Sequence, residues 1–411
     1  MSDLTSTSVL RPAPKGLKGL VQQAVFAAMP WFFSVLRRVK PILKVGGMVL
    51  TSRYDHVREV FATDQAFGVV YAPKLDVIMG GEPFFLGMAD TPVYRQDVSV
   101  MRKVVVAADL PQLAKDVEAR AEAIVAAAGG RIDVVDTLTR AVTFGFLSEY
   151  FGVPKPANGD LRVWATRLFE FQFADQGNDP SLRAEVDQIA PALRAHIDAV
   201  IAGRRSAPEQ DDVLGRCLAR QRAGEAGYSD VEIRTALMGF IVGGPPQPPM
   251  VVPQAMEQLL RRPTALAEAQ AAARADDDDR LWGYVVEAMR FDPLAPGLPR
   301  IALTDWTLAR DTSSASLVPK GSQVLAAFAS AMMDPRRVRN PGVFDPERPD
   351  SDYIHFGYGL HECFGRFINR ATLHLMLKPL LKRPGLRRAP GAEGRLQKNG
   401  PFAARLVVNF D

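Results

Sequence analysis

Cysteine is scarce in this sequence. The 411 residues contain two cysteines, Cys217 and Cys363, so a disulfide framework is excluded and a reducing, cytoplasmic compartment is expected. Histidine is also scarce, with five residues scattered along the chain, and no Cys/His cluster has the spacing of a zinc site. A metal held by protein side chains alone is therefore a poor explanation for either thiol.

Excess charge of one sign is missing as well. The formal net charge is only +4, and no run of lysine and arginine is interleaved with aromatic residues. We therefore expect no nucleic acid partner. The polar, proline-containing start of the chain does not have the build of a secretory signal.

Long apolar runs are also absent. Residues 17–40 are the most apolar stretch near the start, but Gln22, Gln23 and Pro30 interrupt it, and a membrane-spanning helix needs about 20 apolar residues. We expect no transmembrane segment, and a first helix that packs on the core. The alternative is a helix that lies on a membrane surface. Its aromatic residues would make that contact: Phe26, Trp31, Phe32 and Phe33.

What is present is a long helical pattern followed by short strands. Apolar residues recur at helical spacing from 110 to 260, and after 292 short alternating runs are split by proline and glycine. Ser229 and Glu232 have the spacing of a capping box, which predicts a helix start. A last helix is expected from about Arg366 to Leu381. No repeat or linker is evident, so we predict one domain over 1–411, mainly α with a small β region, in which 1–43 form an N-terminal extension and the first helix.

The stretch "VGGPPQPPM" (242–250) interrupts the predicted central helix. Each proline removes a backbone donor and clashes with the preceding turn. The helix must either end at Gly244 and restart near Met250, or unwind locally. A surface linker or a proline-rich ligand segment is the alternative, but the apolar sequence on both sides argues against it.

The stretch "HFGYGLHECFGR" (355–366) surrounds Cys363. Gly357 and Gly359 permit a tight turn that lies close to a flat partner, and Gly365 precedes the last predicted helix. A thiol near a helix N-terminus is favoured as a thiolate. Three readings stay open from the residues alone: a nucleophile with His361 as base, a metal ligand, or an inert buried cysteine.

The ten residues "FGYGLHECFG" (356–365) resemble the haem-thiolate signature of the cytochrome P450 superfamily. Three other segments fit in the same order. "EAMR" supplies Glu287 and Arg290, and "AMMDP" followed by "FDPER" supplies Arg348. The resemblance extends from about residue 45 to the C-terminus. It implies a bacterial-type enzyme of the soluble class, with a prism-like helical domain around haem.

The resemblance also implies roles for single residues. Cys363 would be the axial ligand of haem b, and this thiolate pushes electron density onto the iron. Glu287, Arg290 and Arg348 would form a structural ion network rather than a catalytic one. The other residues expected to contact the cofactor are Tyr94, Arg102, Arg300, Phe356, Gly357, His361 and Gly365, with Arg300 and His361 on the propionates.

The sequence departs from the family pattern in two places. In the segment 90–103, Tyr94 and Val98 stand where a His or Trp and a basic residue are usual, so Arg95 or Arg102 would have to supply the charge. In the distal helix, Gly243 and Gly244 match, but Pro246 stands in place of the usual acid and Gln247 in place of the usual alcohol. Gln247 can donate and accept hydrogen bonds but cannot titrate. Dioxygen cleavage therefore lacks its ordinary proton path.

Three functions follow as hypotheses. The first is a monooxygenase that inserts one oxygen atom from O2 into an apolar small molecule (a lipid, terpenoid, steroid or aromatic). Its catalytic residues would be Gln247, Gly243 and Gly244, and Gln247, ordered water or a polar group of the substrate would organise proton delivery. The second is a peroxide-dependent or rearranging haem-thiolate enzyme, and the third is a non-catalytic haem carrier. We expect the substrate pocket to include Phe84, Phe85, Leu86, Phe240, Pro246, Leu294 and Ala295.

The monooxygenase hypothesis requires an external electron donor, such as a ferredoxin with its reductase. Basic residues that follow the cysteine could steer an acidic donor. They are Arg366, Arg370, Lys378, Lys382, Arg383, Arg387 and Arg388. The alternative is an ordinary solvated helix with cations near its C-terminus.

Overall fold

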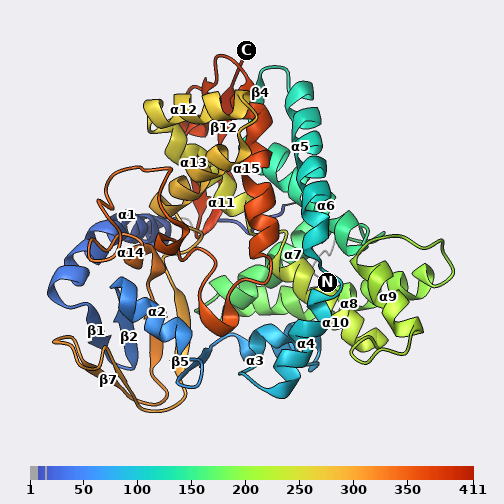
Figure 1. Cartoon of the computed structure of the whole chain (residues 1–411), viewed down its shortest axis with the longest axis horizontal. Helices are drawn as coiled ribbons and strands as arrows, with labels where there is room; N and C mark the ends of the chain where they lie inside the picture. Colours follow the sequence, from blue (N-terminus) through green and yellow to red (C-terminus); the bar gives the residue numbers. More distant parts are fainter. Residues whose placement is uncertain (1–7, 14–15) are drawn as a thin grey trace.

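A computed structural model describes residues 8–13 and 16–411, and it divides into a large helical part and a smaller sheet part (Figure 1). The predicted fold class, mainly α with a small β region, is confirmed. The helices are α1 (Gly16–Val39), α2 (Tyr54–Ala62), α3 (Ala72–Met79), α4 (Pro92–Arg102), α5 (Leu110–Ala127), α6 (Ala141–Phe151), α7 (Leu161–Phe169), α8 (Pro180–Arg204), α9 (Val213–Arg222), α10 (Asp230–Gly243), α11 (Pro248–Leu260), α12 (Pro263–Arg274), α13 (Asp278–Phe291), α14 (Phe328–Ala331) and α15 (Arg366–Lys382).

The main sheet has the strand order β1 (Ile42–Val45), β2 (Met48–Thr51), β8 (Gln323–Ala326), β5 (Leu298–Ala302) and β3 (Phe67–Val69). Only β2 and β8 pair in parallel. A second sheet has the order β4 (Arg131–Asp133), β12 (Val407–Asn409) and β9 (Arg387–Arg388). Two hairpins complete the strands: β6 (Trp306–Leu308) with β7 (Ser316–Val318), and β10 (Gln397–Asn399) with β11 (Phe402–Arg405).

Two predicted helix signals take the expected form. Ser229 caps α10, and its backbone amide donates to the Glu232 carboxylate in a complete capping box. The central helix ends at Gly243 and restarts at Pro248, two residues before the predicted restart at Met250. The earlier restart is possible because proline is tolerated in the first helical turn. Pro245 and Pro246 are buried, so the surface-linker alternative is wrong.

Helix α1 is only partly covered by the rest of the protein. Phe33 is 4% exposed, whereas Trp31 is 71% exposed, and the side chain of Phe26 lies outside the described residues. The prediction of a helix packed on the core therefore describes only one face of α1. Within the described part of the chain, no helix combines the length and the apolar character needed to cross a bilayer.

Candidate functional site

The loop that carries Cys363 is shaped by two glycines. Gly357 and Gly359 have φ of 75° and 76°, the left-handed region that glycine adopts without strain. A Cβ on Gly359 would lie 2.6 Å from the Phe61 carbonyl oxygen. Gly359 therefore allows a close approach of the loop to the backbone of α2. The Cys363 amide donates to the Phe356 carbonyl at 2.8 Å, which closes the loop just before α15.

The sulfur of Cys363 lies at the start of α15 near amide donors. Burial raises the pKa of the thiol, while a hydrogen bond from the Gly365 amide and the charge of Arg102 act in the opposite direction. The side-chain nitrogen of Asn369 lies 4.0 Å from Sγ. Sequence reasoning missed Asn369. The sequence offered one signal for this residue: Asn369 falls in the first turn of the helix that begins three residues after the cysteine.

Buried nitrogen atoms of two side chains, one guanidinium and one imidazole, lie close to this loop without an anion. Arg300 is 4% exposed, and within the described residues its guanidinium has no carboxylate partner and donates only to the Pro299 carbonyl, at 3.0 Å. His361 Nδ1 is buried and has no hydrogen-bond partner there either. Burial, and then the charge of Arg300, lower the pKa of His361 to about 4. An unpaired buried guanidinium is costly, so this cluster is built to receive a carboxylate.

Two tyrosines border the same cluster. Burial raises the pKa of Tyr71 to about 12, against a smaller opposing effect of the Arg300 charge, which indicates that Tyr71 lies near Arg300. Sequence reasoning also missed Tyr71, because no motif contains it. Tyr94 Oη donates to the Leu360 carbonyl at 2.5 Å, and its ring lies 6.1 Å from that of His361. Tyr94 therefore fixes the loop beside Arg300 and His361.

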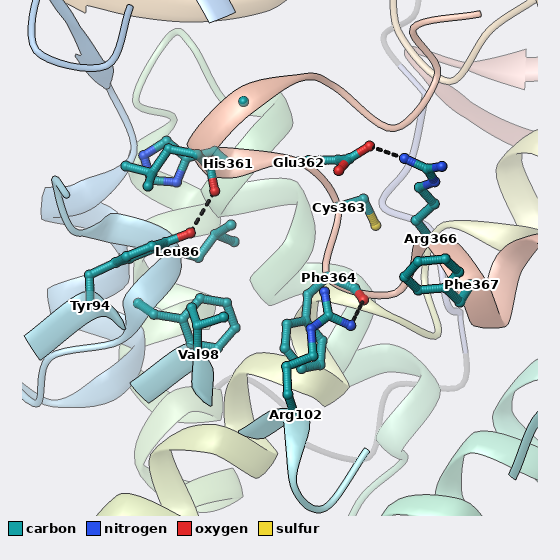
Figure 2. Close-up of a pocket in the computed structure, with 13 residues that line it drawn as sticks. Leu86, Tyr94, Val98, Arg102, His361, Glu362, Cys363, Phe364, Arg366 and Phe367 are labelled. Atoms are coloured by element: carbon teal, nitrogen blue, oxygen red, sulfur yellow. Dashed lines mark hydrogen bonds and ion pairs between the residues drawn. The ribbon is translucent and has the colours of Figure 1, made fainter. Parts of the chain in front are cut away.

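A cavity of about 150 Å³ lies between α4 and the cysteine loop. Figure 2 shows Tyr94, Val98 and Arg102 along α4, facing residues 361–364. Arg102 donates to the Phe364 carbonyl at 3.1 Å, and its guanidinium carbon lies 3.9 Å from the centroid of the Phe364 ring. The guanidinium of Arg102 is therefore bound to the loop, rather than directed at a separate anion.

Aromatic side chains from three distant segments meet beside this loop. The ring of Phe364 is stacked on Phe240 of α10 at 5.4 Å and lies 5.5 Å from Phe85. Phe84 covers Gly239, where an added Cβ would lie 2.1 Å from the Phe84 ring. These rings therefore form an apolar cluster beside the cysteine loop.

The remaining predicted pocket residues are more dispersed. Leu86 lines the cavity beside Cys363, but Leu294, Ala295 and Pro246 are not on its wall. Leu294 packs on the large helical core, whereas Ala295 packs on the smaller core beneath the main sheet. The cavity next to the cysteine is therefore narrower than the pocket expected from the sequence.

The break between α10 and α11 contains no titratable side chain. Gly243, Gly244, Pro246 and Gln247 form this turn, and the Gln247 side-chain amide donates to the Gly243 carbonyl. That carbonyl is at the C-terminus of α10, where the last carbonyl groups have no hydrogen-bond partner within the helix. Gln247 therefore caps the interrupted helix, and its amide is the one polar side chain among residues 243–249.

Glu287, Arg290 and Arg348 lie together in the core. Both carboxylate oxygens of Glu287 accept from Arg290, at 2.6 and 2.8 Å, and Arg348 lies 3.4 Å away. The Tyr353 hydroxyl and the Asp345 amide also donate to Glu287, at 3.1 and 3.0 Å. The carboxylate is completely buried, so this network joins α13 to the segment that precedes the cysteine loop.

The donor set of the site fits a haem. It combines a cysteine sulfur held near backbone amides with a buried guanidinium and a buried imidazole nitrogen that have no anion of their own, and a haem offers an iron and two carboxylates. Cys363 would hold the iron, and Arg300 and His361 would hold the propionates.

Comparison with known proteins identifies a family and several relatives. The model of the family described as Cytochrome P450 matches residues 165–403, more than half of the chain. A bifunctional dioxygenase–epoxy alcohol synthase of Fusarium oxysporum is 38% identical over 134 residues, which cover 32% of this chain but only 10% of that protein. The erythromycin C-12 hydroxylase of Saccharopolyspora erythraea is 26% identical over 318 residues, 75% of this chain and 76% of the hydroxylase. Among solved structures, CalO2 is similar with a TM-score of 0.78 at 21% identity, covering 97% of this chain and 99% of CalO2.

Proposed function

The chain belongs to the cytochrome P450 family and is a haem-thiolate oxidoreductase, and from this premise we propose that it transfers oxygen from a hydroperoxide of an apolar molecule. The reaction is a rearrangement: the O–O bond breaks, one oxygen remains as a hydroxyl group, and the other adds across a neighbouring double bond. An epoxy alcohol results. Reactant and product are isomers, so the reaction needs no external electrons or protons.

The observation that carries this proposal is the turn between α10 and α11. Its polar side chain, Gln247, does not titrate and is bonded to the Gly243 carbonyl. A reaction that begins with O2 needs protons delivered to oxygen, whereas the rearrangement begins from oxygen already at the peroxide level. The similarity to a protein named as an epoxy alcohol synthase supports the same reaction class.

Haem b, when bound through Cys363, supplies a redox-active iron that can cleave an O–O bond. The chain's own residues supply the environment. Arg300 and His361 would hold the propionates, and the Gly365 amide would stabilise the thiolate. Phe84, Phe85 and Phe240 form an apolar wall that excludes water and packs against an apolar chain.

A second candidate is a monooxygenase that uses O2 and electrons from a redox partner. Two observations favour it. The erythromycin hydroxylase is similar over three quarters of this chain, and Arg366 and Arg370 are about half exposed beside the cysteine loop. In that case ordered water or a polar group of the substrate would have to deliver the protons that Gln247 cannot.

One assay separates the two candidates. The purified holoprotein is given an unsaturated fatty acid hydroperoxide labelled with ¹⁸O, without a reductant. Separately, it is given the parent fatty acid with a surrogate ferredoxin, reductase and NADPH. We expect an epoxy alcohol that retains both labelled oxygens in the first assay, and little product in the second. Product from the second assay alone would replace the proposal with the monooxygenase.

We also propose that the enzyme works at a lipid surface. A hydroperoxide of an apolar molecule concentrates in membranes, and exposed apolar side chains such as Trp31 on α1 support a contact there.

A further inference from the structure

Helix α1 carries an exposed apolar stripe along one side. Val21, Val25, Phe32, Val35 and Val39 recur at helical spacing, which places them on one face of the helix. All five are exposed, Val39 at 77% and Val25 at 55%, and Trp31 flanks them. A surface helix of a globular protein normally turns such a stripe toward the core. We call these six residues the apolar face of α1.

The chain segment that carries the apolar face contains no negative charge of its own, whereas Glu170, Asp175 and Asp179 line the cavity beside Val21, at the opposite end of the face from Arg38. Between Asp3 and Asp55 there is no acidic residue. The basic residues of this segment are Arg11, Lys15, Lys18, Arg37, Arg38, Lys40, Lys44 and Arg53.

Three of these cations are free to meet an external anion. Arg38 and Lys40 stand on either side of Val39 at the end of α1, and Lys44 lies in β1. All three are exposed, and none forms an ion pair with another described residue. By contrast, Arg37 is buried and donates to Ser330 at 2.8 Å. An exposed apolar stripe next to unpaired cations is typical of helices that lie in the headgroup region of an anionic membrane.

This charge distribution distinguishes a lipid surface from a second copy of the chain. An isologous contact through α1 would bring two acid-free, basic segments against each other, and like charges at an interface cost several kcal/mol. An anionic bilayer presents the opposite charge and accepts Val, Trp and Phe side chains at the level of its headgroups.

The apolar face also borders a large surface cavity. A cavity of about 860 Å³ lies between Val21, the segment 10–12, the loop 174–180 and the turn between β10 and β11. Val21 belongs both to the apolar face and to the cavity wall. A surface that meets the apolar face therefore also meets the edge of this cavity, which is within the size range of pockets for small molecules.

We propose that the apolar face of α1 docks on an anionic lipid surface, with Arg38, Lys40 and Lys44 facing the lipid headgroups. Docking brings the 860 Å³ cavity to the membrane boundary, where an apolar substrate is concentrated. The docking itself rests on α1 and its charges. Only the identity of the apolar substrate that reaches the cavity from the membrane rests on the proposed function.

The test is co-flotation of the full-length holoprotein with vesicles. One set is pure phosphatidylcholine, and the other contains 30% phosphatidylserine. We expect at least tenfold tighter binding to the second set, because each cation near an anionic surface contributes about 1 kcal/mol, and binding should weaken as NaCl is raised. The triple reversal Arg38→Glu/Lys40→Glu/Lys44→Glu should lose this preference, and Trp31→Ser/Val35→Ser/Val39→Ser should weaken binding to both sets.

Matched variants control for total charge and total apolar surface. Lys115→Glu/Lys155→Glu/Arg395→Glu reverses three exposed cations outside α1 and β1. Val343→Ser removes an exposed apolar side chain that does not belong to α1. Both should bind like the unaltered protein. All substituted residues are exposed, so the variants are expected to fold.

Two outcomes would overturn the docking proposal. One is equal binding of the α1 variants and the controls. The other is a concentration-dependent dimer in sedimentation that the α1 serine variant abolishes, which would assign the face to a second copy. Neither outcome depends on product formation, so failure of the proposed reaction would leave the vesicle result intact.

Discussion

At the scale of single residues, the site is defined by polar groups that lack partners. Arg300 is the clearest case, because a buried guanidinium without a carboxylate destabilises the fold unless a ligand supplies the anion. The same residue therefore opposes folding of the free chain and favours binding of a dicarboxylate such as haem.

Replacing Arg300 with methionine should separate these two effects. Hydrogen bonds to charged groups contribute about 1.5–3 kcal/mol, so haem should dissociate roughly 10- to 100-fold faster from the Arg300→Met variant. The haem-free chain should melt at the same or a higher temperature. Haem transfer to apomyoglobin and melting followed by circular dichroism measure the two quantities. Arg310→Met, at an exposed position, should change neither the rate of haem loss nor the melting temperature. Slower or unchanged haem loss from Arg300→Met would exclude the propionate role.

Asn369 offers a second test at this scale. Its side-chain amide is 4.0 Å from the Cys363 sulfur, and a donor to the thiolate withdraws electron density from the iron it ligates. Asn369→Leu should therefore lower the reduction potential and raise the iron–sulfur stretching frequency, and Asn369→Gln should restore part of the difference. Anaerobic redox titration and resonance Raman spectroscopy measure these quantities. Thr372→Val, one turn further along α15, should leave both unchanged, and an identical response of the two sites would contradict the assignment.

Burial of His374 predicts a loss of stability in mild acid. Burial lowers the pKa of His374 to about 4, so between pH 6.5 and 4 the unfolded chain binds a proton that the folded chain does not. The free energy of unfolding should fall across that window as pH falls, by about 3 kcal/mol for this group at 1.36 kcal/mol per pH unit. Urea unfolding at several pH values should give a shallower decline for His374→Gln. Parallel pH profiles for the variant and the unaltered protein would refute this.

At the scale of elements, α13 is tied to the segment before the cysteine loop by Glu287. Removing the charge with Glu287→Gln leaves Arg290 buried without a counter-ion and Arg348 with only Asp352, 3.6 Å away, which should cost roughly 3–5 kcal/mol of unfolding free energy. Glu393→Gln is the matched control. Glu393 pairs with Arg131 and Arg405 at the surface, so its loss should cost less than about 1 kcal/mol. Equal urea midpoints for the two variants would mean that the buried network adds nothing beyond a surface pair.

The elements that sequence reasoning predicted are those specified by local chemistry. The capping box at Ser229, the helix after Gly365 and the interruption at Pro245 each depend on a few neighbouring residues. The isolation of Arg300, the contact of Phe84 with Gly239 and the approach of Asn369 to the sulfur depend on how distant elements pack. No local pattern contains that information, so these features appear only in the folded chain.

At the scale of the whole molecule, surface charge decides which partners can reach the site. The basic residues after Cys363 are less available than the sequence suggested. Lys378 is 3% exposed and contacts Asp278 at 2.8 Å, and Lys382 contacts Asp276 at 2.6 Å. Arg366 and Arg370 remain about half exposed, and Arg366 lies on the wall of the cavity beside Cys363. Arg387 is also exposed, but Arg366 and Arg370 are the exposed members of the basic set in the first two turns after the cysteine loop, where each pairs with one acid, Glu362 and Asp279 respectively. These two arginines are therefore the members of the set that an acidic electron donor could contact beside Cys363.

Reversing both arginines tests whether the enzyme draws on such a donor. Arg366→Glu/Arg370→Glu should slow stopped-flow reduction by a ferredoxin about tenfold at low salt, with the difference shrinking as salt is added. Conversion of a fatty acid hydroperoxide should be unchanged, because that rearrangement needs no partner. Lys155→Glu/Arg395→Glu, at exposed positions away from the cysteine loop, should leave both rates unaltered.

Slow reduction of the double variant with intact hydroperoxide conversion would mean that this face still binds an electron donor, but that the principal reaction does not use it. Equal reduction rates in the two double variants would show that the face does not dock a donor, and the case for a partner-driven monooxygenase would then lose its structural support.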